Sequence, residues 1–158
     1  MKTGVLILDN LRSVENTGSI FRTAEGLGVS KIYCIGTTPT PLDRFGRKRT
    51  DFAKVSLGAE EMLEWEYAKD IAPVIKELRS QKFKVLALEQ DERSVSLQAA
   101  SCKLSTFALI VGNEVEGVAT EALRLCDTVV EIPMRGEKES LNVSVSTGIA
   151  LYSLMLEY

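Results

Sequence analysis

Residues 132–145 read Ile-Pro-Met-Arg-Gly-Glu-Lys-Glu-Ser-Leu-Asn-Val-Ser-Val. This is the most informative segment of the 158-residue chain for predicting its fold. It leaves a predicted strand and opens the last predicted helix, residues 142–156. Ser140 and Asn142 are both natural helix caps. Residues 143–150 mix Val with Ser, Thr, Gly and Ala, which are mediocre helix formers, so close packing must hold this helix. Such small residues also suit tight contact with another backbone, including that of a second subunit.

Upstream of this segment, apolar runs alternate with helical patterns. Strands are predicted at residues 4–8, 31–35, 84–88, 106–111 and 128–132, and helices at 16–28, 57–63, 70–80 and 118–125. The last helix carries Val145, Ile149, Tyr152 and Leu156 along one apolar stripe. This alternation predicts an α/β fold, a single domain over residues 1–158 with a mostly parallel sheet. In such sheets ligands bind beyond the carboxyl ends of the strands.

The turn after the first strand lacks the usual signatures of nucleotide binding. Residues 8–22 contain no Gly-x-Gly-x-x-Gly, and no P-loop occurs in the chain. Asn16 is a good helix N-cap, which is its simplest role. Arg22 falls on a face of small residues, where an arginine is usually only solvated.

A second turn, residues 111–118, reads Val-Gly-Asn-Glu-Val-Glu-Gly-Val and leads from a buried strand into a helix through two glycines. A turn of this kind can place backbone N–H groups against a ligand. The same pattern also fits a plain tight turn followed by a helix start.

Taken together, the three segments resemble the SpoU family of RNA ribose 2'-O-methyltransferases, in the SPOUT superfamily, over essentially the whole chain. The matching elements are Asn16-x5-Arg22 with Gly18 between, Gly-Asn-Glu-x-x-Gly at residues 112–117, and Ile-Pro-Met-x-Gly with Ser-Leu-Asn-Val-Ser-Val at residues 132–145. The resemblance implies a C-terminal trefoil knot, which local patterns could not indicate because knots are nearly absent from proteins. It also implies a homodimer, with the cofactor in the knot and the active site at the subunit interface.

The reaction implied by this resemblance moves a methyl group from S-adenosylmethionine to a ribose 2'-hydroxyl of RNA and leaves S-adenosylhomocysteine, without a metal. By resemblance Arg22 is the catalytic arginine, often described as a general base. Because arginine normally stays protonated, we expect it instead to hold the phosphate or ribose and to stabilise the developing alkoxide. Asn16, Ser140 and Asn142 would orient Arg22 and the ribose.

Backbone groups of three loops are expected to hold the cofactor. The resemblance assigns this role to residues at or after the ends of predicted strands, namely Leu88, Glu89, Gly112, Asn113, Glu114, Ile132, Met134 and Leu141. The match at Leu88 and Glu89 is loose. Val115 and Ser146 depart from the family pattern, in which Gly and Ala are frequent, but neither removes a catalytic group.

The absence of histidine excludes Ser-His-Asp and Cys-His catalysis and histidine-ligated zinc. The net charge of -3 argues against a general nucleic-acid coating protein, so RNA must be held by a local patch. One candidate patch follows the second strand and consists of Arg44, Arg47, Lys48, Arg49 and Lys54. Many family members carry an N-terminal RNA-binding domain. Here the first motif begins near the N-terminus, so we expect the catalytic dimer alone to hold the RNA.

Cys34, Cys102 and Cys126 are widely spaced and odd in number, so we interpret them as free thiols in a reducing cytoplasm. No apolar run is long enough to span a membrane, and the N-terminus does not fit a signal peptide. We therefore expect a cytoplasmic protein.

The substrate and two alternatives stay open. Transfer RNA is favoured over ribosomal RNA, because minimal family members are often tRNA enzymes. One alternative is a catalytically silent RNA-binding module of the same fold, which turnover would distinguish. The other is a nucleotide-binding α/β protein of another class, which the identity of the cofactor would distinguish.

Overall fold

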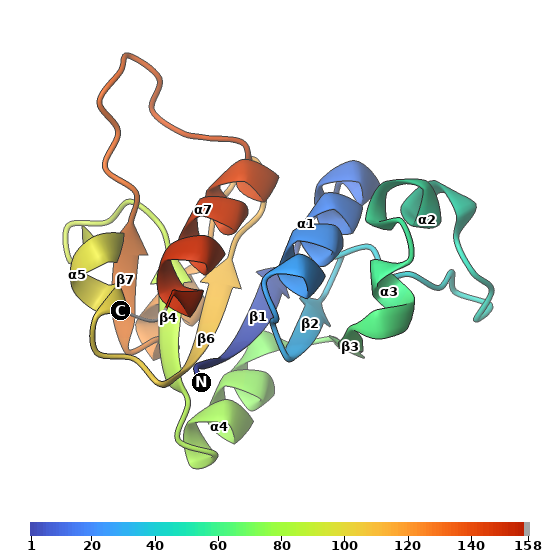
Figure 1. The fold of residues 1–158 in the computed structure, drawn as a ribbon, viewed down its shortest axis with the longest axis horizontal. Coiled ribbons are helices and arrows are strands. Elements are labelled where there is room, and N and C mark those ends of the chain that lie inside the picture. The colour runs from blue at the N-terminus through green and yellow to red at the C-terminus, as the bar shows by residue number, and fades with distance from the viewer. Residues whose placement is uncertain (157–158) are drawn as a thin grey trace.

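Seven strands form one sheet in the computed structural model, which describes residues 1–156 (Figure 1). The sheet has the order β3-β2-β1-β6-β4-β7-β5, and its strand pairs are parallel, which confirms the predicted fold class. The strands are β1 (Thr3–Asp9), β2 (Lys31–Ile35), β3 (Glu64–Ala68), β4 (Lys84–Leu88), β5 (Val95–Ser96), β6 (Thr106–Val111) and β7 (Thr128–Glu131).

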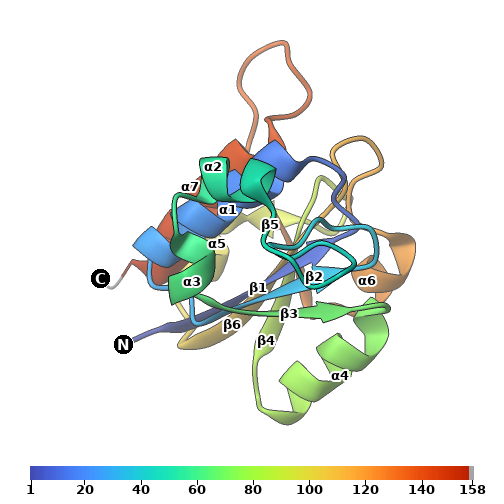
Figure 2. The same cartoon turned by 90° about the vertical axis from the view of Figure 1, so that its right-hand side faces the viewer.

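Helices cover both faces of this sheet (Figure 2). One face carries α1 (Val14–Gly26), α2 (Thr50–Ser56), α3 (Ala59–Met62), α5 (Leu97–Ser101) and α7 (Val143–Met155). The other face carries α4 (Ile71–Ser80) and α6 (Thr120–Leu125). Because both faces are covered, the strands read as apolar runs without polar alternation.

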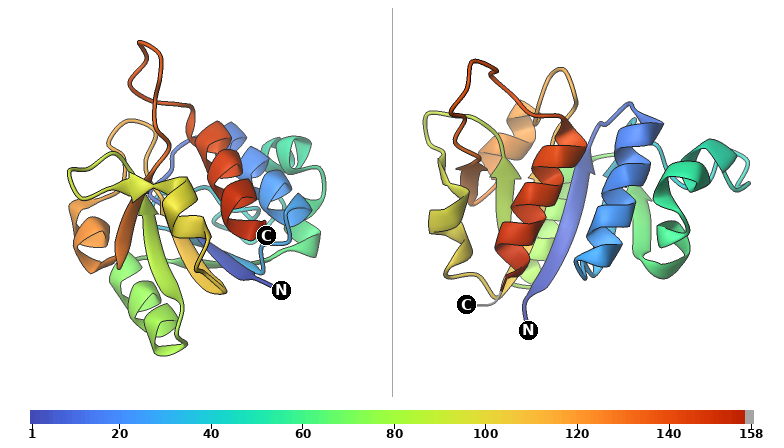
Figure 3. Two further views of the ribbon diagram at one scale, coloured as in Figure 1. Left: turned by 60° about the vertical axis from the view of Figure 1, so that its left-hand side comes forward. Right: turned by 45° about the horizontal axis from the view of Figure 1, so that its top comes forward.

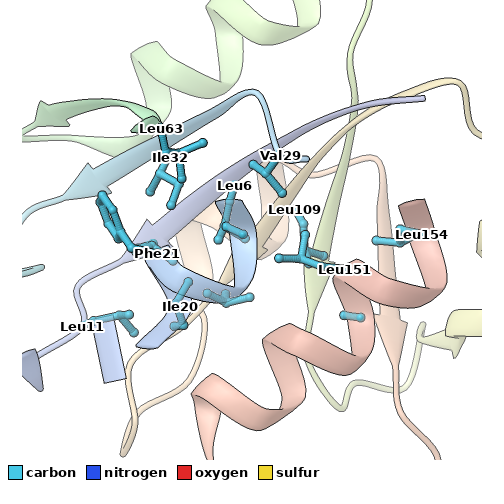
Figure 4. Close-up of a cluster of buried hydrophobic side chains, with 14 of the residues drawn as sticks. Leu6, Leu11, Ile20, Phe21, Val29, Ile32, Leu63, Leu109, Leu151 and Leu154 are labelled. Atoms are coloured by element: carbon cyan, nitrogen blue, oxygen red, sulfur yellow. The ribbon is translucent and has the colours of Figure 1, made fainter. Parts of the chain in front are cut away.

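Successive residues of β1 enter two separate cores. Leu6 lies in the core beneath α1 and α7, and Ile7 lies in the core beneath α4 and α6. Figure 4 shows Phe21 of α1 and Leu151 of α7 within the first core, near Leu6 and Leu109 of the sheet. The packing of α1 and α7 on this one face holds the last helix beside the first.

Several predicted elements have different ends in the structure. The N-cap of α1 is Ser13, whose side chain accepts a hydrogen bond from the Asn16 N–H, so the prediction that Asn16 is the cap is wrong. The short helix predicted at residues 57–63 is present as α3 but begins two residues later, because Leu57 and Gly58 adopt left-handed conformations with φ of 53° and 90°. They separate α2 from α3. The strands predicted at 84–88 and 106–111 are confirmed.

The apolar stripe identified on the last helix, α7, faces solvent rather than the sheet. Val145, Ile149 and Tyr152 are 51%, 43% and 58% exposed, whereas Thr147, Ala150, Leu151 and Leu154 are the buried residues. The reason is that α7 is apolar on both faces, so spacing alone could not select the one that meets the sheet. An apolar face is therefore left uncovered on this chain.

The segment between β7 and α7, residues 132–142, rises above the carboxyl ends of the strands before it returns to α7 (Figure 3). It contacts the loop after β4, where the Gln90 side-chain amide donates to the Glu139 carbonyl at 2.7 Å. This contact places the C-terminal segment against a loop from earlier in the chain. The trefoil knot itself stays a prediction from the family resemblance.

Candidate functional site

A cleft of about 700 Å³ opens at the carboxyl ends of β4, β6 and β7, where parallel sheets commonly bind ligands. Residues 88–90, 111–118 and the segment after β7 line it, together with the first turn of α1. It brings together these predicted site residues: Asn16, Leu88, Glu89, Gly112, Asn113, Glu114, Ile132, Met134, Ser140, Leu141 and Asn142.

The floor of the cleft is a tight turn between two glycines. The Asn113 and Gly117 backbones exchange hydrogen bonds of 3.0 and 2.9 Å, and the Asn113 side chain accepts from the Val115 and Glu116 N–H groups. A Cβ on Gly112 would lie 2.1 Å from backbone atoms of Gly117. Only glycine therefore fits at position 112 without moving the turn.

Glu89 joins the loop after β4 to this turn. One of its carboxylate oxygens accepts from the Gln90 N–H at 2.9 Å, and the other accepts from the Val118 N–H at 3.0 Å. A Cβ on Gly117, whose φ is +72°, would lie 2.3 Å from the Glu89 carboxylate. Glu89, which matches the family pattern only loosely, thus forms part of the wall of the cleft.

Glu114 joins the turn to the start of α1. Its carboxylate accepts from the backbone N–H groups of Arg12 and Ser13 at 3.1 and 3.0 Å and from the Asn16 side chain at 3.4 Å. Burial alone would raise the pKa of Glu114, but these hydrogen bonds outweigh it and leave the pKa lowered. Glu114 therefore holds the first motif as an anion.

Asn142 connects the same group to the last helix. Its side-chain amide donates to Asn16 Oδ1 at 3.2 Å, and its oxygen caps α7 by accepting from the Ser144 N–H at 2.9 Å. Asn16, Glu114 and Asn142 come from the three motif segments and are linked by direct hydrogen bonds. Ser140 lies at the same cleft.

The cleft is acidic. Its lining contains five carboxylates and, within residues 1–156, no lysine or arginine. Two carboxylates, Glu89 and Glu114, accept hydrogen bonds from backbone N–H groups. The carboxylate of half-buried Glu131 makes no hydrogen bond or ion pair with another described residue. Sequence reasoning missed Glu131 and Gln90, although each lies at or just after the carboxyl end of a strand. Such a lining favours a positively charged ligand and repels phosphate.

Arg22 lies outside the cleft. It is exposed on α1, two turns beyond Asn16, and is not among the residues that line the cavity. Its neighbour Thr23 faces α7, where a Cβ on Gly148 would lie 3.5 Å from Thr23 Cγ2. Arg22 therefore lies next in sequence to the residue through which α1 approaches α7.

The predicted RNA-binding residues lie elsewhere, in and after the loop that follows β2. Three of the five are ion-paired: Arg47 with Asp43, Arg49 with Asp51, and Lys48 with Glu61. Arg44 and Lys54 have no ion pair to any residue that the structure describes. The positive charge of this patch is thus partly offset by its neighbours.

Other sites are not evident in the described chain. Within residues 1–156, no three His, Cys, Asp or Glu side chains gather as metal ligands, and no helix has the length and apolarity to cross a membrane. The three cysteines are free thiols. Burial raises the pKa of Cys34 to about 12, so this thiol stays protonated at neutral pH.

Comparison with known proteins matches residues 4–152 to the model of the SpoU rRNA Methylase family. The 23S rRNA (guanosine-2'-O-)-methyltransferase RlmB of Ralstonia nicotianae is 34% identical over 94% of this chain and 56% of the relative. A tRNA (guanosine(18)-2'-O)-methyltransferase of Aquifex aeolicus is 29% identical over 94% of this chain and 66% of the relative. The chain thus spans between about half and two thirds of the length of these relatives.

The fold is also found among solved structures. An AdoMet-bound rRNA methyltransferase from Sinorhizobium meliloti has a TM-score of 0.80 and 26% identity, over 97% of this chain and 55% of that chain. The same three motif segments that build the cleft lie inside the matched range, residues 4–152.

Proposed function

The chain belongs to the SpoU rRNA Methylase family, and from this premise we propose that it is an S-adenosylmethionine-dependent RNA ribose 2'-O-methyltransferase. The observation that carries the proposal is the hydrogen-bonded group of Asn16, Glu114 and Asn142 beside the cleft. These side chains come from three distant segments, and together they place polar groups next to a cavity large enough for a cofactor.

The chemistry of the cleft fits this cofactor. S-adenosylmethionine carries a sulfonium and an ammonium group, and an acidic lining without basic side chains suits such a ligand. The loops at Leu88, Gly112 and Ile132 would hold it, with Glu131 available to a cationic group. When bound, the cofactor supplies an electrophilic methyl group whose leaving group is neutral.

The residues of the chain then have two tasks. They must hold the ribose hydroxyl in line with the methyl group, and they must accept or disperse its proton. Asn16, Ser140 and Asn142 have the donors and acceptors to orient a ribose. An arginine side chain is a poor general base, so the role we propose for Arg22 is to bind phosphate and stabilise the developing alkoxide.

A second copy of the chain would bring Arg22 to the cleft. Arg22 lies outside the cleft of its own chain, on a helix, α1, that packs beside α7, and α7 exposes the apolar residues Val145, Ile149 and Tyr152. Apolar surface of this kind commonly marks an interface. We therefore propose a homodimer through α7, in which each chain supplies Arg22 to its partner.

The substrate we propose is tRNA first and rRNA second. The Aquifex aeolicus relative acts on guanosine 18 of tRNA, and the Ralstonia nicotianae relative acts on 23S rRNA. An acidic cleft cannot hold the RNA backbone by itself, so cations outside it must do so. Arg44, Arg47, Lys48, Arg49 and Lys54 are the proposed phosphate contacts.

Calorimetric titration with S-adenosylmethionine and then S-adenosylhomocysteine tests the proposal. We expect micromolar binding of both, near one ligand per chain. Gly112→Val, in which the added side chain displaces the turn at the floor of the cleft, serves as the control and should bind neither. No heat at millimolar ligand from the folded wild-type protein would contradict the proposal and favour the silent RNA-binding module.

A further inference from the structure

The loop after β2 ends in a well-ordered hairpin tip at residues 42–48. Leu42 and Lys48 form an antiparallel bridge, and the Asp43 N–H donates to the Arg47 carbonyl at 2.8 Å. The Asp43 carboxylate accepts from the Phe45 and Arg47 N–H groups at 2.8 and 3.0 Å. Gly46, with a φ of +76°, closes the turn. Backbone hydrogen bonds and the Asp43 carboxylate therefore stabilise the turn at the tip.

This tip presents an aromatic ring to solvent. Phe45 is 66% exposed, and its ring lies 4.7 Å from the Arg44 guanidinium and 5.0 Å from that of Arg47. Arg47 also forms an ion pair with Asp43, whereas the Arg44 side chain has no hydrogen bond or ion pair to a described residue. A large apolar side chain held out in water by a fixed turn makes no contribution to either core.

We propose that Phe45 is a stacking platform for an unpaired base of the RNA, with Arg44 and Arg47 contacting the adjoining phosphates. Exposed aromatic rings and guanidinium planes are the groups on which unpaired bases stack. Bases inside a duplex are already stacked on one another, so the RNA segment at this contact is single-stranded. The inference rests on the proposed function, since it names the form of RNA which that function takes.

The place of the tip in the fold makes Phe45 a substrate-holding residue. The loop leaves the sheet on the β2–β3 side (Figure 1). The cleft is instead lined by residues at the carboxyl ends of β4, β6 and β7. Phe45 therefore lies outside the cleft of its own chain, and it should affect the binding of RNA without affecting that of the cofactor.

Fluorescence anisotropy with two labelled RNAs tests the inference, using a single strand of about twelve nucleotides and a duplex of equal length. For Phe45→Leu we expect single-strand affinity to fall roughly five- to hundredfold, the range of one lost base stack. Phe45→Trp should retain affinity, and duplex binding should be unchanged in both variants. Tyr67→Leu is the matched control, because Tyr67 is also an exposed aromatic residue, 51% exposed, but lies beside Glu66 on β3.

A spectroscopic readout reports the stacking itself. In a Trp65→Phe background, the indole of Phe45→Trp should be quenched by the single strand and not by the duplex. Equal single-strand affinity of wild type and Phe45→Leu would overturn the inference, as would a wild-type protein that binds neither RNA. Cofactor titration of Phe45→Leu separates the stacking inference from the proposed methyltransferase function. If this variant binds the cofactor and transfers methyl groups normally, and its RNA affinity is unchanged, only the stacking inference is overturned.

Discussion

Substitution of Arg22 should reduce catalysis without weakening cofactor binding. This arginine lies outside the cleft, so Arg22→Lys should bind S-adenosylmethionine with wild-type affinity. Lysine keeps the charge but loses the planar fork of donors, and loss of such transition-state donors costs about a hundredfold or more in kcat. Calorimetry and single-turnover kinetics measure the two effects. Near-normal turnover would remove the guanidinium from the mechanism.

Glu114 should make the stability of the protein depend on pH. Its folded-state pKa lies below the ordinary value of 4.5, so its contribution is present above that pH and is lost as the pH falls through the folded pKa. Because Glu114 is exposed, Glu114→Gln should cost only about 1 kcal/mol at pH 7. Urea unfolding at pH 7 and at about pH 3 checks this. A difference that persists undiminished at the lower pH would contradict the assigned role of the anion.

The members of the candidate site could be predicted from the sequence only through the family resemblance. Asn16 lies 98 residues before Glu114 and 126 residues before Asn142, and no local spacing relates it to either. Spacing also could not show that Arg22 lies outside the cleft. Glu114 bonds to Ser13 and Asn16 at the start of α1, whereas Arg22 lies on a later turn of the same helix.

At the scale of elements, α7 should be the subunit interface. Ile149 is 43% exposed and lies between Val145 and Tyr152 on the uncovered face. Ile149→Glu places a charge there without touching the buried residues of the helix. We expect a folded monomer with a normal circular dichroism spectrum and no methyl transfer. Sedimentation velocity measures the oligomeric state, and Lys76→Glu, an exposed position of α4 on the other face of the sheet, is the control. A dimer in Ile149→Glu would contradict the proposed interface.

The elements that the sequence analysis found are the ones with long apolar patterns. β4 and β6 are buried among other strands and read clearly, whereas β3, Glu-Trp-Glu-Tyr-Ala, is paired only with β2 and is mostly exposed. An edge strand needs no apolar run, so its pattern is weak. The turn at Leu57 that separates α2 from α3 could not be predicted for another reason, since a left-handed backbone is uncommon for leucine.

At the level of the dimer, we predict that two variants that are inactive alone form one active site when they are combined in a mixed dimer. Arg22→Ala lacks the guanidinium, and Gly112→Val lacks a usable cleft. In a dimer of one chain of each kind, the intact cleft receives Arg22 from the other chain. Purified through two different tags, this mixed dimer should have about half the wild-type rate. An inactive mixed dimer of normal stability would mean that Arg22 serves its own chain.

Transfer of a labelled methyl group to RNA is the decisive test of the proposed reaction. The protein is incubated with methyl-labelled S-adenosylmethionine and with unmodified tRNA or rRNA transcripts, and the RNA is digested to nucleosides for mass spectrometry. We predict label on the ribose, as a 2'-O-methylnucleoside, with tRNA the better substrate. Label on bases alone, or no label from a dimer that binds the cofactor, would contradict it.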